Sequence, residues 1–320
     1  MDVVQDFVQA VERRLAAALE RDPCSVLNAA SRALCLEGGG KRVRARLTCL
    51  LGTAAGAPPR SLEEVAASAE LIHAASLLHD DVVDEATLRR GLPSVNARFG
   101  NAVAVLAGDW LLSSAFALLT PHPREVTTEA IETVAEMARA ACLELSARGR
   151  ADLALSDWRE IAEGKTGALF AFCGRSAARV AGREDLVDPA GQFGRRLGVA
   201  FQLADDCKDL AGGEPGKDRF ADLKNGNPSM PILWAAARSP QARARLEAAW
   251  AGAAPPSDDE VRGLGAALIA QGAAEAALKA LEDEVAAAVG CLSALGSPEW
   301  LAEIEQLAHS FAAGLVTEAA

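Results

Sequence analysis

The chain contains no tyrosine, and its seven cysteines are scattered singly along 320 residues without a CxxC pair. An odd number of isolated cysteines argues against a disulfide framework and against a cysteine zinc site. Basic charge is scarce as well, because 32 Lys and Arg stand against 44 Asp and Glu, for a net charge of −12. We therefore expect no broad basic surface and no nucleic-acid partner.

Long apolar stretches are also missing. A membrane-spanning helix needs roughly 18 or more consecutive apolar residues, and the most apolar run, residues 102–119, is interrupted by Asp109. The N-terminus carries Asp2 and Asp6 and lacks the basic-then-apolar pattern of a signal peptide. The sequence predicts a protein of the cytoplasm without a transmembrane segment.

What the chain has in abundance is alanine, the residue with the highest helix propensity, at 70 positions. Apolar residues recur at the helical period, for example Leu71, Ala74, Ala75 and Leu78. Turns rich in glycine and proline separate about ten to twelve segments of helix length. No linker is long or polar enough to mark a boundary, so we expect residues 1–320 to form a single all-α domain, one large helical bundle.

Two aspartate clusters are the sharpest feature. One reads HDDVVD and contains Asp80 and Asp84; the other reads DDCKD and contains Asp205 and Asp209. Within each pair the residues are four apart, so both carboxylates share a helix face. Two carboxylates on an apolar helix repel each other unless a cation lies between them. Because ligands that offer only oxygen favour a hard cation, the clusters predict Mg²⁺.

Basic residues are gathered after a glycine turn, in GGGKRVR at residues 38–44. Glycines permit close backbone approach, and helix N-termini favour phosphate. His73 stands two helical turns before Asp80 on the same face. Further donors occur elsewhere: Arg89, Arg90, Lys165 and Thr166. Clustered cations in an acidic protein indicate an anion, and a diphosphate bridged by Mg²⁺ accounts for both the acids and the bases.

Together these motifs resemble the trans-isoprenyl diphosphate synthases, or polyprenyl synthetases. The resemblance extends from Gly38 to Pro231 and rests on GGGKRVR, HAASLLHDDVVDEATLRRG, KTGALF, FQLADDCKD and GKDRFADLKNG, in family order. It implies a helical fold around a deep central cavity. It also implies that isopentenyl diphosphate is joined 1′–4 to an allylic diphosphate with loss of diphosphate, and that the protein is a homodimer.

The resemblance also implies a role for each matching residue. Three Mg²⁺ ions are expected, two on Asp80, Asp81 and Asp84 and a third on Asp205 with Asp206 and Asp209. The principal metal ligands among these would be Asp80, Asp84 and Asp205, and the catalytic set would also include Lys165. The residues matching the isopentenyl diphosphate ligands are Lys41, Arg44, His73 and Arg90. Those matching the allylic diphosphate contacts are Arg89, Lys165, Thr166, Gln202 and Lys217.

Four positions depart from the family pattern. Ala45 stands where proline is usual, and Lys208 occupies an aliphatic position inside the second aspartate cluster. Asn227 takes a place often held by lysine, and the glutamine usual near Glu144 is not evident. A lysine beside Asp205 is the departure most relevant to metal binding.

Product length is expected to depend on side chains one turn before Asp80. Family members that stop at C15 often carry an aromatic residue there, whereas this chain has the small residues Ala75 and Ser76. We therefore expect a product of C20 or longer. Phe116 is a candidate floor of the tunnel, although ordinary core packing would also explain it.

Two other functions compete with this interpretation. A class I terpene cyclase also uses a DDxxD motif, but it pairs that motif with an Asn/Ser/Glu metal motif and lacks the basic glycine-led cluster. A non-catalytic partner subunit of a heteromeric synthase would usually have lost one of the aspartate clusters, and both are intact here.

Overall fold

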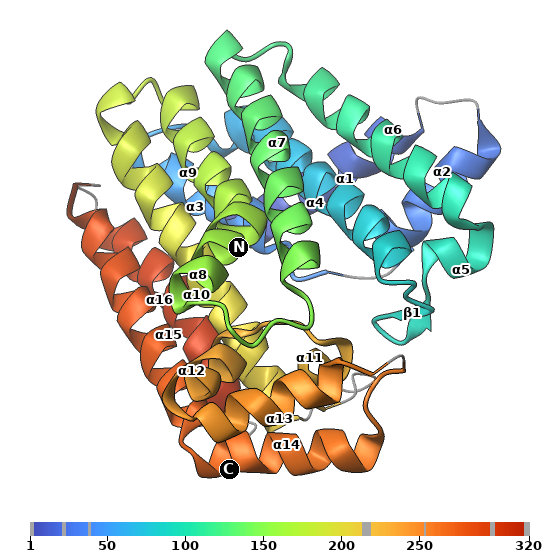
Figure 1. The fold of residues 1–320 in the computed structure, drawn as a ribbon. Helices are drawn as coiled ribbons and strands as arrows, with labels where there is room; N and C mark the ends of the chain where they lie inside the picture. Colours follow the sequence, from blue (N-terminus) through green and yellow to red (C-terminus); the bar gives the residue numbers. More distant parts are fainter. Residues whose placement is uncertain are drawn as a thin grey trace. The chain divides into compact units, whose positions relative to one another are not determined.

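The computed structural model describes residues 3–20, 24–37, 40–212, 219–252, 254–294 and 298–316. The all-α class is confirmed, because helices make up nearly all the regular structure of these residues and the two strands among them are two residues long (Figure 1). The chain divides into two compact units. Unit 1 comprises Met1–Val134, Leu169–Gly191 and Leu292–Ile304, and unit 2 comprises Ala135–Ala168, Gln192–Cys291 and Glu305–Ala320. A single domain with one cavity stays a prediction.

The N-terminal elements belong to unit 1. In chain order they are α1 (Val3–Leu19), α2 (Ser25–Arg32), the π-helical turn η1 (Ala33–Glu37), α3 (Val43–Ala54), the 3₁₀ turn η2 (Pro59–Leu62), α4 (Glu63–Val83), β1 (Leu88–Arg89), β2 (Leu92–Pro93), α5 (Val95–Phe99) and α6 (Asn101–Leu119). Unit 1 also includes the first part of α7 (Arg124–Ala147), most of α9 (Ala168–Val180), η4 (Glu184–Leu186) and the start of α10 (Val187–Ala211).

Helix α4 is the centre of unit 1 and packs lengthwise against α6 (Figure 1). Its N-terminal Glu63 and Glu64 both accept hydrogen bonds from Arg14 on α1 at 2.9 Å, and acidic residues in a first turn also suit the helix dipole. Near the other end, Gly108 of α6 leaves room for a side chain of α4, because a Cβ there would lie 2.2 Å from Nε2 of His79. The packing of His79 against Gly108 therefore fixes the turn of α4 that precedes Asp80.

A short hairpin follows α4. Strand β1 pairs antiparallel with β2, and the two residues between them, Arg90 and Gly91, both have positive φ (54° and 77°). Two positive φ values in a two-residue loop are the mark of a type I′ turn, which matches the twist of the strands. The sequence suggested only a turn here, because strands this short leave no alternating pattern. A non-glycine residue in this conformation is uncommon, which draws attention to Arg90.

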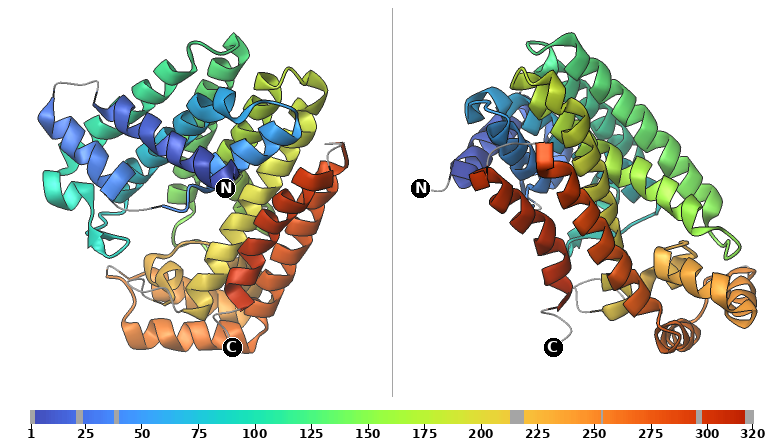
Figure 2. Two further views of the ribbon diagram at one scale, coloured as in Figure 1. Left: turned by 180° about the vertical axis from the view of Figure 1, so that it is seen from behind. Right: turned by 90° about the vertical axis from the view of Figure 1, so that its left-hand side faces the viewer.

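Unit 2 contains the remaining elements. They are the end of α7, α8 (Leu155–Ala162), the π-helical turn η3 (Glu163–Gly167), the rest of α10, α11 (Ala221–Asn225), α12 (Met230–Arg238), α13 (Pro240–Trp250), α14 (Asp258–Ala270), α15 (Ala273–Gly290) and the latter part of α16 (Pro298–Val316), whose start, with most of η5 (Cys291–Ala294), falls in unit 1. Helices α12 to α15 pack on one another (Figure 2). Their core holds Phe220, which lies against Gly265, together with Leu223, Leu246 and Leu264.

By length and composition alone, α6 could cross a membrane. Its 18-residue window has a mean hydropathy of 1.8 and is 44% buried in the structure. The pair α14 and α15 passes the same test only as one span bent by 62°. Core helices of soluble proteins pass this test as well, so it does not decide the expectation of no transmembrane segment. Two large apolar side chains of α6 are exposed, Val105 at 40% and Leu106 at 58%.

Candidate active site

The charges of four arginines act on one histidine, His73, in unit 1. Arg44 is 8% exposed at the start of α3, with its guanidinium 5.1 Å from the centre of the Phe170 ring. Burial lowers the pKa of His73 well below its ordinary value, and the charges of Arg44, Arg90, Arg89 and Arg42 lower it further. Arg44 and Arg90 thus place positive charge near His73, and the binding role expected for these three residues stays a prediction. Such crowded positive charge favours a bound anion.

Arg42 was not among the predicted site residues, yet it is built into this cluster. It has φ 47° at the N-cap of α3, and its guanidinium donates to Glu12 at 2.7 Å and to the Cys35 carbonyl at 2.5 Å. A Cβ at Gly40 would lie 3.5 Å from Nη1 of Arg42 and 3.6 Å from Nη1 of Arg90, so both guanidinium groups flank this glycine. The GGGKRVR run is the signal that could have identified Arg42.

Glu70 of α4 supports the cluster from inside. It is 6% exposed, lies 3.7 Å from Nη1 of Arg42 and accepts the backbone N–H of Ala45 at 3.1 Å. The family's usual proline has no N–H and could not make this bond. The departure at Ala45 therefore adds a tie between α3 and α4. Lys41, by contrast, is exposed on the segment before α3.

The three aspartates of the first cluster differ in environment. Asp81 is 1% exposed and bound by Arg89, whose Nε lies 2.9 and 2.8 Å from its two oxygens and whose Nη2 lies 2.6 Å from Oδ1. This pair ties β1 to the end of α4. Asp80 is half-buried on the last turn of α4, and Asp84 is exposed at its C-cap. Two predicted substrate and metal contacts, Arg89 and Asp81, are thus paired with each other.

In the second cluster Asp206 is the buried member, at 3% exposure. Its carboxylate accepts Trp158 Nε1 at 3.0 Å, the Met230 backbone N–H at 2.9 Å and Gln202 Nε2 at 3.1 Å. Burial raises the pKa of Asp206 well above its ordinary value, and the charge of Asp222 adds to the shift. The hydrogen bonds from Met230 and Gln202 oppose it. Asp206 therefore joins α8, α10 and α12.

Asp205 and Asp209 lie on the same helix with different neighbours. The side chain of Asp205 is 38% exposed and 3.9 Å from Nζ of Lys208, the unusual lysine of this cluster. Asp209 accepts the backbone N–H groups of Ala221 at 2.8 Å and Asp222 at 3.4 Å, so it caps the start of α11. Among the described residues, no group of three or more His, Cys, Asp or Glu side chains is arranged to hold a metal ion by itself.

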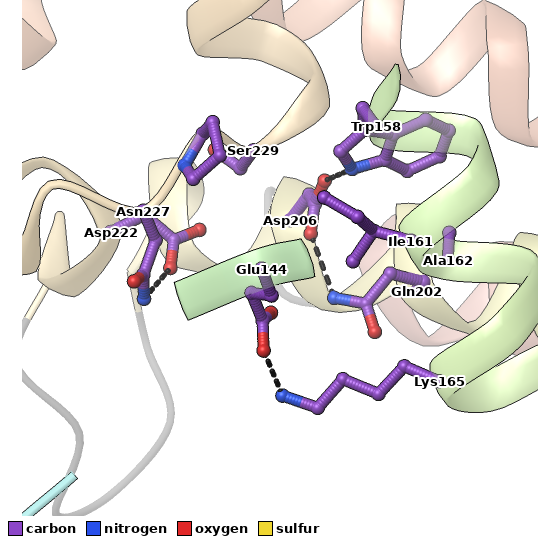
Figure 3. Close-up of a pocket in the computed structure, with 11 residues that line it drawn as sticks. Glu144, Trp158, Ile161, Ala162, Lys165, Gln202, Asp206, Asp222, Asn227 and Ser229 are labelled. Carbon is purple, nitrogen blue, oxygen red and sulfur yellow. Dashed lines mark hydrogen bonds and ion pairs between the residues drawn. The ribbon is translucent and has the colours of Figure 1, made fainter. Parts of the chain in front are cut away.

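A small pocket of about 50 Å³ lies in unit 2 (Figure 3). Lys165 of η3 forms an ion pair with Glu144 of α7, and Thr166 Oγ1 donates to Gln202 Oε1 at 3.3 Å. The residues that line the pocket are Glu144, Trp158, Ile161, Ala162, Lys165, Gln202, Asp206, Asp222, Asn227, Pro228 and Ser229. Lys165, Gln202 and Asp206 thus line the same pocket. Asn227 donates to Asp222 at 3.3 Å, and Lys224 pairs with Asp258 at 2.9 Å.

Some predicted residues lie elsewhere. Lys217 falls outside the described residues. Phe116 is half-buried on α6. This burial fits both interpretations of Phe116, as the floor of a tunnel and as an ordinary packing residue. Trp158 was missed altogether, because a lone tryptophan in an amphipathic helix carries no sequence signal of a polar contact.

Close helix approach sets the position of Lys165 and Thr166. A Cβ at Gly198 of α10 would lie 2.5 Å from the Cα and 2.8 Å from the N of Gly167, so η3 and α10 touch backbone to backbone. We expect Gly198→Ala to destabilise the protein by about 1–3 kcal/mol, the usual range for overpacking, and to weaken allylic substrate binding by moving Thr166 away from Gln202. Thermal unfolding and KM values for both substrates measure these effects.

Gly263→Ala is the matched control for that variant. Gly263 is an exposed glycine of α14 with open space around the added Cβ, so alanine there is expected to stabilise the helix by up to about 1 kcal/mol. Equal unfolding temperatures for Gly198→Ala and wild type would contradict the close approach.

Comparison with known proteins agrees with the geometry. The polyprenyl synthetase family model matches residues 25–267. The chain is 35% identical over 286 residues to (2E,6E)-farnesyl diphosphate synthase of Mycobacterium tuberculosis, covering 84% of this chain and 78% of that protein. It is 38% identical over 207 residues to octaprenyl diphosphate synthase of Escherichia coli, covering 62% and 63%.

Among solved structures, a polyprenyl synthase from Caulobacter crescentus, crystallised with calcium and isoprenyl diphosphate, superposes with a TM-score of 0.91. It is 29% identical, over 97% of this chain and 95% of that one. These similarities confirm the family resemblance and the helical isoprenoid synthase fold. The chain is therefore an enzyme that belongs to the polyprenyl synthetase family, the trans-prenyl diphosphate synthases.

Proposed function

We propose that the enzyme condenses isopentenyl diphosphate with an allylic diphosphate, 1′–4, to give a trans-polyprenyl diphosphate of C20 or longer. The observation that carries the proposal is the cluster of Arg42, Arg44, Arg89 and Arg90 around His73. Four guanidinium groups in one region of a protein with net charge −12 suit a diphosphate, which guanidinium donors bind through paired hydrogen bonds. In the proposal Arg44, His73 and Arg90 of this cluster hold isopentenyl diphosphate together with Lys41, and Arg89 contacts the allylic diphosphate.

The less buried aspartates fit Mg²⁺. Asp84 is exposed, and Asp80 and Asp205 are half-buried, so each carboxylate retains some solvent exposure. Asp81 and Asp206 are buried, at 1% and 3% exposure. Magnesium usually takes one or two carboxylates and completes its shell with water and substrate phosphates. Bound there, it would neutralise charge on the diphosphate leaving group. We propose that three Mg²⁺ ions bind, the number that the resemblance implies.

The remaining chemistry falls to the chain's own residues. In the proposal Lys165 and Gln202 donate to the allylic diphosphate, and their fixed positions stabilise the charge that develops as its C–O bond breaks. Thr166, which the resemblance counts among the allylic diphosphate contacts, holds the Gln202 amide through its hydroxyl. Glu144 holds the ammonium group of Lys165 in place. Apolar side chains of α4 exclude the water that would capture an allylic cation. The C4 alkene carbon of isopentenyl diphosphate then bonds to the allylic cation. The resulting cation loses a proton, and the resemblance implies that the departing diphosphate takes it.

Product length is the finer part of the proposal, since the relatives named above make products as different as farnesyl and octaprenyl diphosphate. Support for C20 or longer comes from the small side chains before Asp80. Ala75 is fully buried, and Ser76 is half-buried with its hydroxyl donating to the His73 carbonyl at 2.8 Å. Neither fills space as an aromatic ring would.

The test is a condensation assay with purified protein, Mg²⁺, isopentenyl diphosphate and farnesyl diphosphate, with products separated by chromatography. We expect prenyl diphosphates of C20 or longer, and no product in EDTA. Hydrocarbon formed from farnesyl diphosphate alone would indicate a terpene cyclase. The absence of any condensation would indicate a partner subunit, and either result would refute the proposal.

We further propose a homodimer formed through α6. Leu106 is 58% exposed and Val105 40% exposed on this apolar helix, and exposed apolar helix faces usually mark an interface. In sedimentation at micromolar concentration we expect a dimer that Leu106→Glu converts to monomer, with Val3→Glu on α1 as the control. A monomeric wild type that floats with lipid vesicles would assign this face to a membrane instead.

A further inference from the structure

Trp158 is a buried side chain for which the reaction as described has no role. It lies on α8 with 8% exposure, and its indole N–H, a group that can only donate, reaches Asp206 Oδ2 at 3.0 Å. The next residue, Arg159, binds both oxygens of Glu284 on α15, with Nη1 and Nη2 at 2.9 Å. The ion pair of Arg159 with Glu284 thus fixes α8, and the preceding residue, Trp158, binds Asp206 from this fixed helix.

Asp206, which Trp158 holds in place, in turn binds the side-chain amide of Gln202. Oδ2 already accepts from Trp158 and from the Met230 backbone, and Oδ1 accepts from Gln202 Nε2 at 3.1 Å (Figure 3). Three N–H groups converge on this carboxylate, and the one from Gln202 places the amide nitrogen toward it. The amide oxygen then faces away and accepts the Thr166 hydroxyl at 3.3 Å.

The hydrogen-bond chain therefore sets which group Gln202 can offer to a ligand. A primary amide has two N–H donors, and one of them is used by Asp206. With the amide turned the other way, its oxygen would face Asp206 and the two acceptors would repel. Orientation by Asp206 thus leaves Gln202 a second N–H donor. Lys165 of η3 lines the same pocket as Gln202, and Thr166, the next residue of η3, binds the Gln202 oxygen.

We propose that Trp158 is a positioning residue for the allylic diphosphate, acting through Asp206 to orient the Gln202 amide so that its second N–H meets a diphosphate oxygen. This inference rests on the proposed function, because that function supplies the diphosphate. It assigns Asp206 to the orientation of a neutral donor and leaves metal binding to Asp205. Nothing in it requires Trp158 to touch the substrate.

The first test is Trp158→Phe, which keeps an aromatic ring and removes the donor. We expect the Kd of farnesyl diphosphate, measured by calorimetry with Mg²⁺ and no isopentenyl diphosphate, to rise about tenfold, the scale of one hydrogen bond to a charged group. The KM for the allylic substrate is expected to rise in parallel, while the KM for isopentenyl diphosphate stays within about twofold of wild type. A merely structural role would not separate the two substrates in this way.

Trp250→Phe is the matched control, because it removes an indole N–H that donates to the Leu223 carbonyl at 2.8 Å in the same unit. Trp158→His is the rescue, since its Nε2 lies at the same bond count from Cγ as the indole nitrogen. We expect the control to bind farnesyl diphosphate as wild type does, and the rescue to recover affinity to within about threefold.

A double-mutant cycle with Gln202→Ala completes the test. If Trp158 acts through Gln202, Trp158→Phe adds less than about twofold to the loss in Kd already caused by Gln202→Ala. Wild-type affinity in Trp158→Phe, equal losses in Trp158→Phe and Trp250→Phe, or independent losses in the cycle would each overturn the inference. Failure of the proposed function is distinct, because wild type would then bind inorganic diphosphate with Mg²⁺ yet form no condensation product.

Discussion

Replacing Asp80 by alanine is expected to lower kcat by at least about 100-fold, the scale for losing a main electrostatic stabiliser of a transition state. Asp80 is half-buried on the last turn of α4, one turn from Asp84. Removing either carboxylate leaves the proposed Mg²⁺ with too few protein ligands to hold the leaving diphosphate. Asp84→Ala and Asp205→Ala are expected to have effects of similar size. Steady-state rates with saturating substrates measure all three.

A second readout separates metal binding from damage to the fold. Mg²⁺ with inorganic diphosphate is expected to raise the unfolding temperature of wild type, because a ligand that binds the folded state stabilises it, and to raise that of Asp80→Ala much less. Asp259→Ala is the control, since Asp259 is an aspartate of α14 with its side chain 92% exposed. Full activity of Asp80→Ala, or of wild type in EDTA, would refute the metal assignment.

Asp81 is expected to behave differently from Asp80. Its carboxylate is enclosed at 1% exposure and bound by Arg89, so removing it leaves a cation without its partner. Loss of one member of a buried pair is destabilising by about 3–5 kcal/mol. Asp81→Ala therefore combines a lower unfolding temperature with displacement of the β1–β2 hairpin, whereas Asp80→Ala is expected to unfold near the wild-type temperature.

The contrast between Asp80 and Asp81 shows how far the sequence leads. Helical spacing correctly predicted helices at both aspartate clusters, because periodicity is a local property of the chain. It could not distinguish members of one cluster, since neighbouring aspartates are chemically alike until tertiary donors reach them. Trp158 and the Met230 backbone reach Asp206 from elsewhere in the chain, and Ala221 and Asp222 reach Asp209. Contacts of that range have no sequence pattern.

Unusual backbone conformations are also features that the sequence patterns did not predict. The basic run GGGKRVR predicted an anion site, but not the left-handed conformation of Arg42 or of Arg90. Nor did the KTG motif indicate that Lys165 and Thr166 lie on a π-helical turn, pressed against Gly198 of α10. Such conformations are held by surrounding structure against their intrinsic preference, and they gather at functional sites. Local propensity therefore fails where the chemistry is concentrated.

The second large effect concerns product length, at Ser76. Each helical turn rises about 5.4 Å, roughly one isoprene unit, so a ring one turn before Asp80 would meet the growing chain early. Ser76 is half-buried, and its hydroxyl donates to the His73 carbonyl at 2.8 Å. We expect Ser76→Phe to shift the main product from C20 or longer to C15, with diphosphate release from the first condensation largely retained. Product chromatography with geranyl diphosphate and isopentenyl diphosphate measures the shift.

Ala75→Phe is expected to shorten the product as well, but at a cost in stability. Ala75 is fully buried, and packed interiors accept extra volume only by distortion, typically about 1–3 kcal/mol and more for a large ring. Ser61→Phe is the control for both, because Ser61 is a half-buried serine whose hydroxyl also donates to a carbonyl three residues back, at 2.8 Å. We expect it to leave product length unchanged. A wild type that stops at C15, or an unshortened product from both Ser76→Phe and Ala75→Phe, would mean that α4 does not line the path of the growing chain and that another element sets its length.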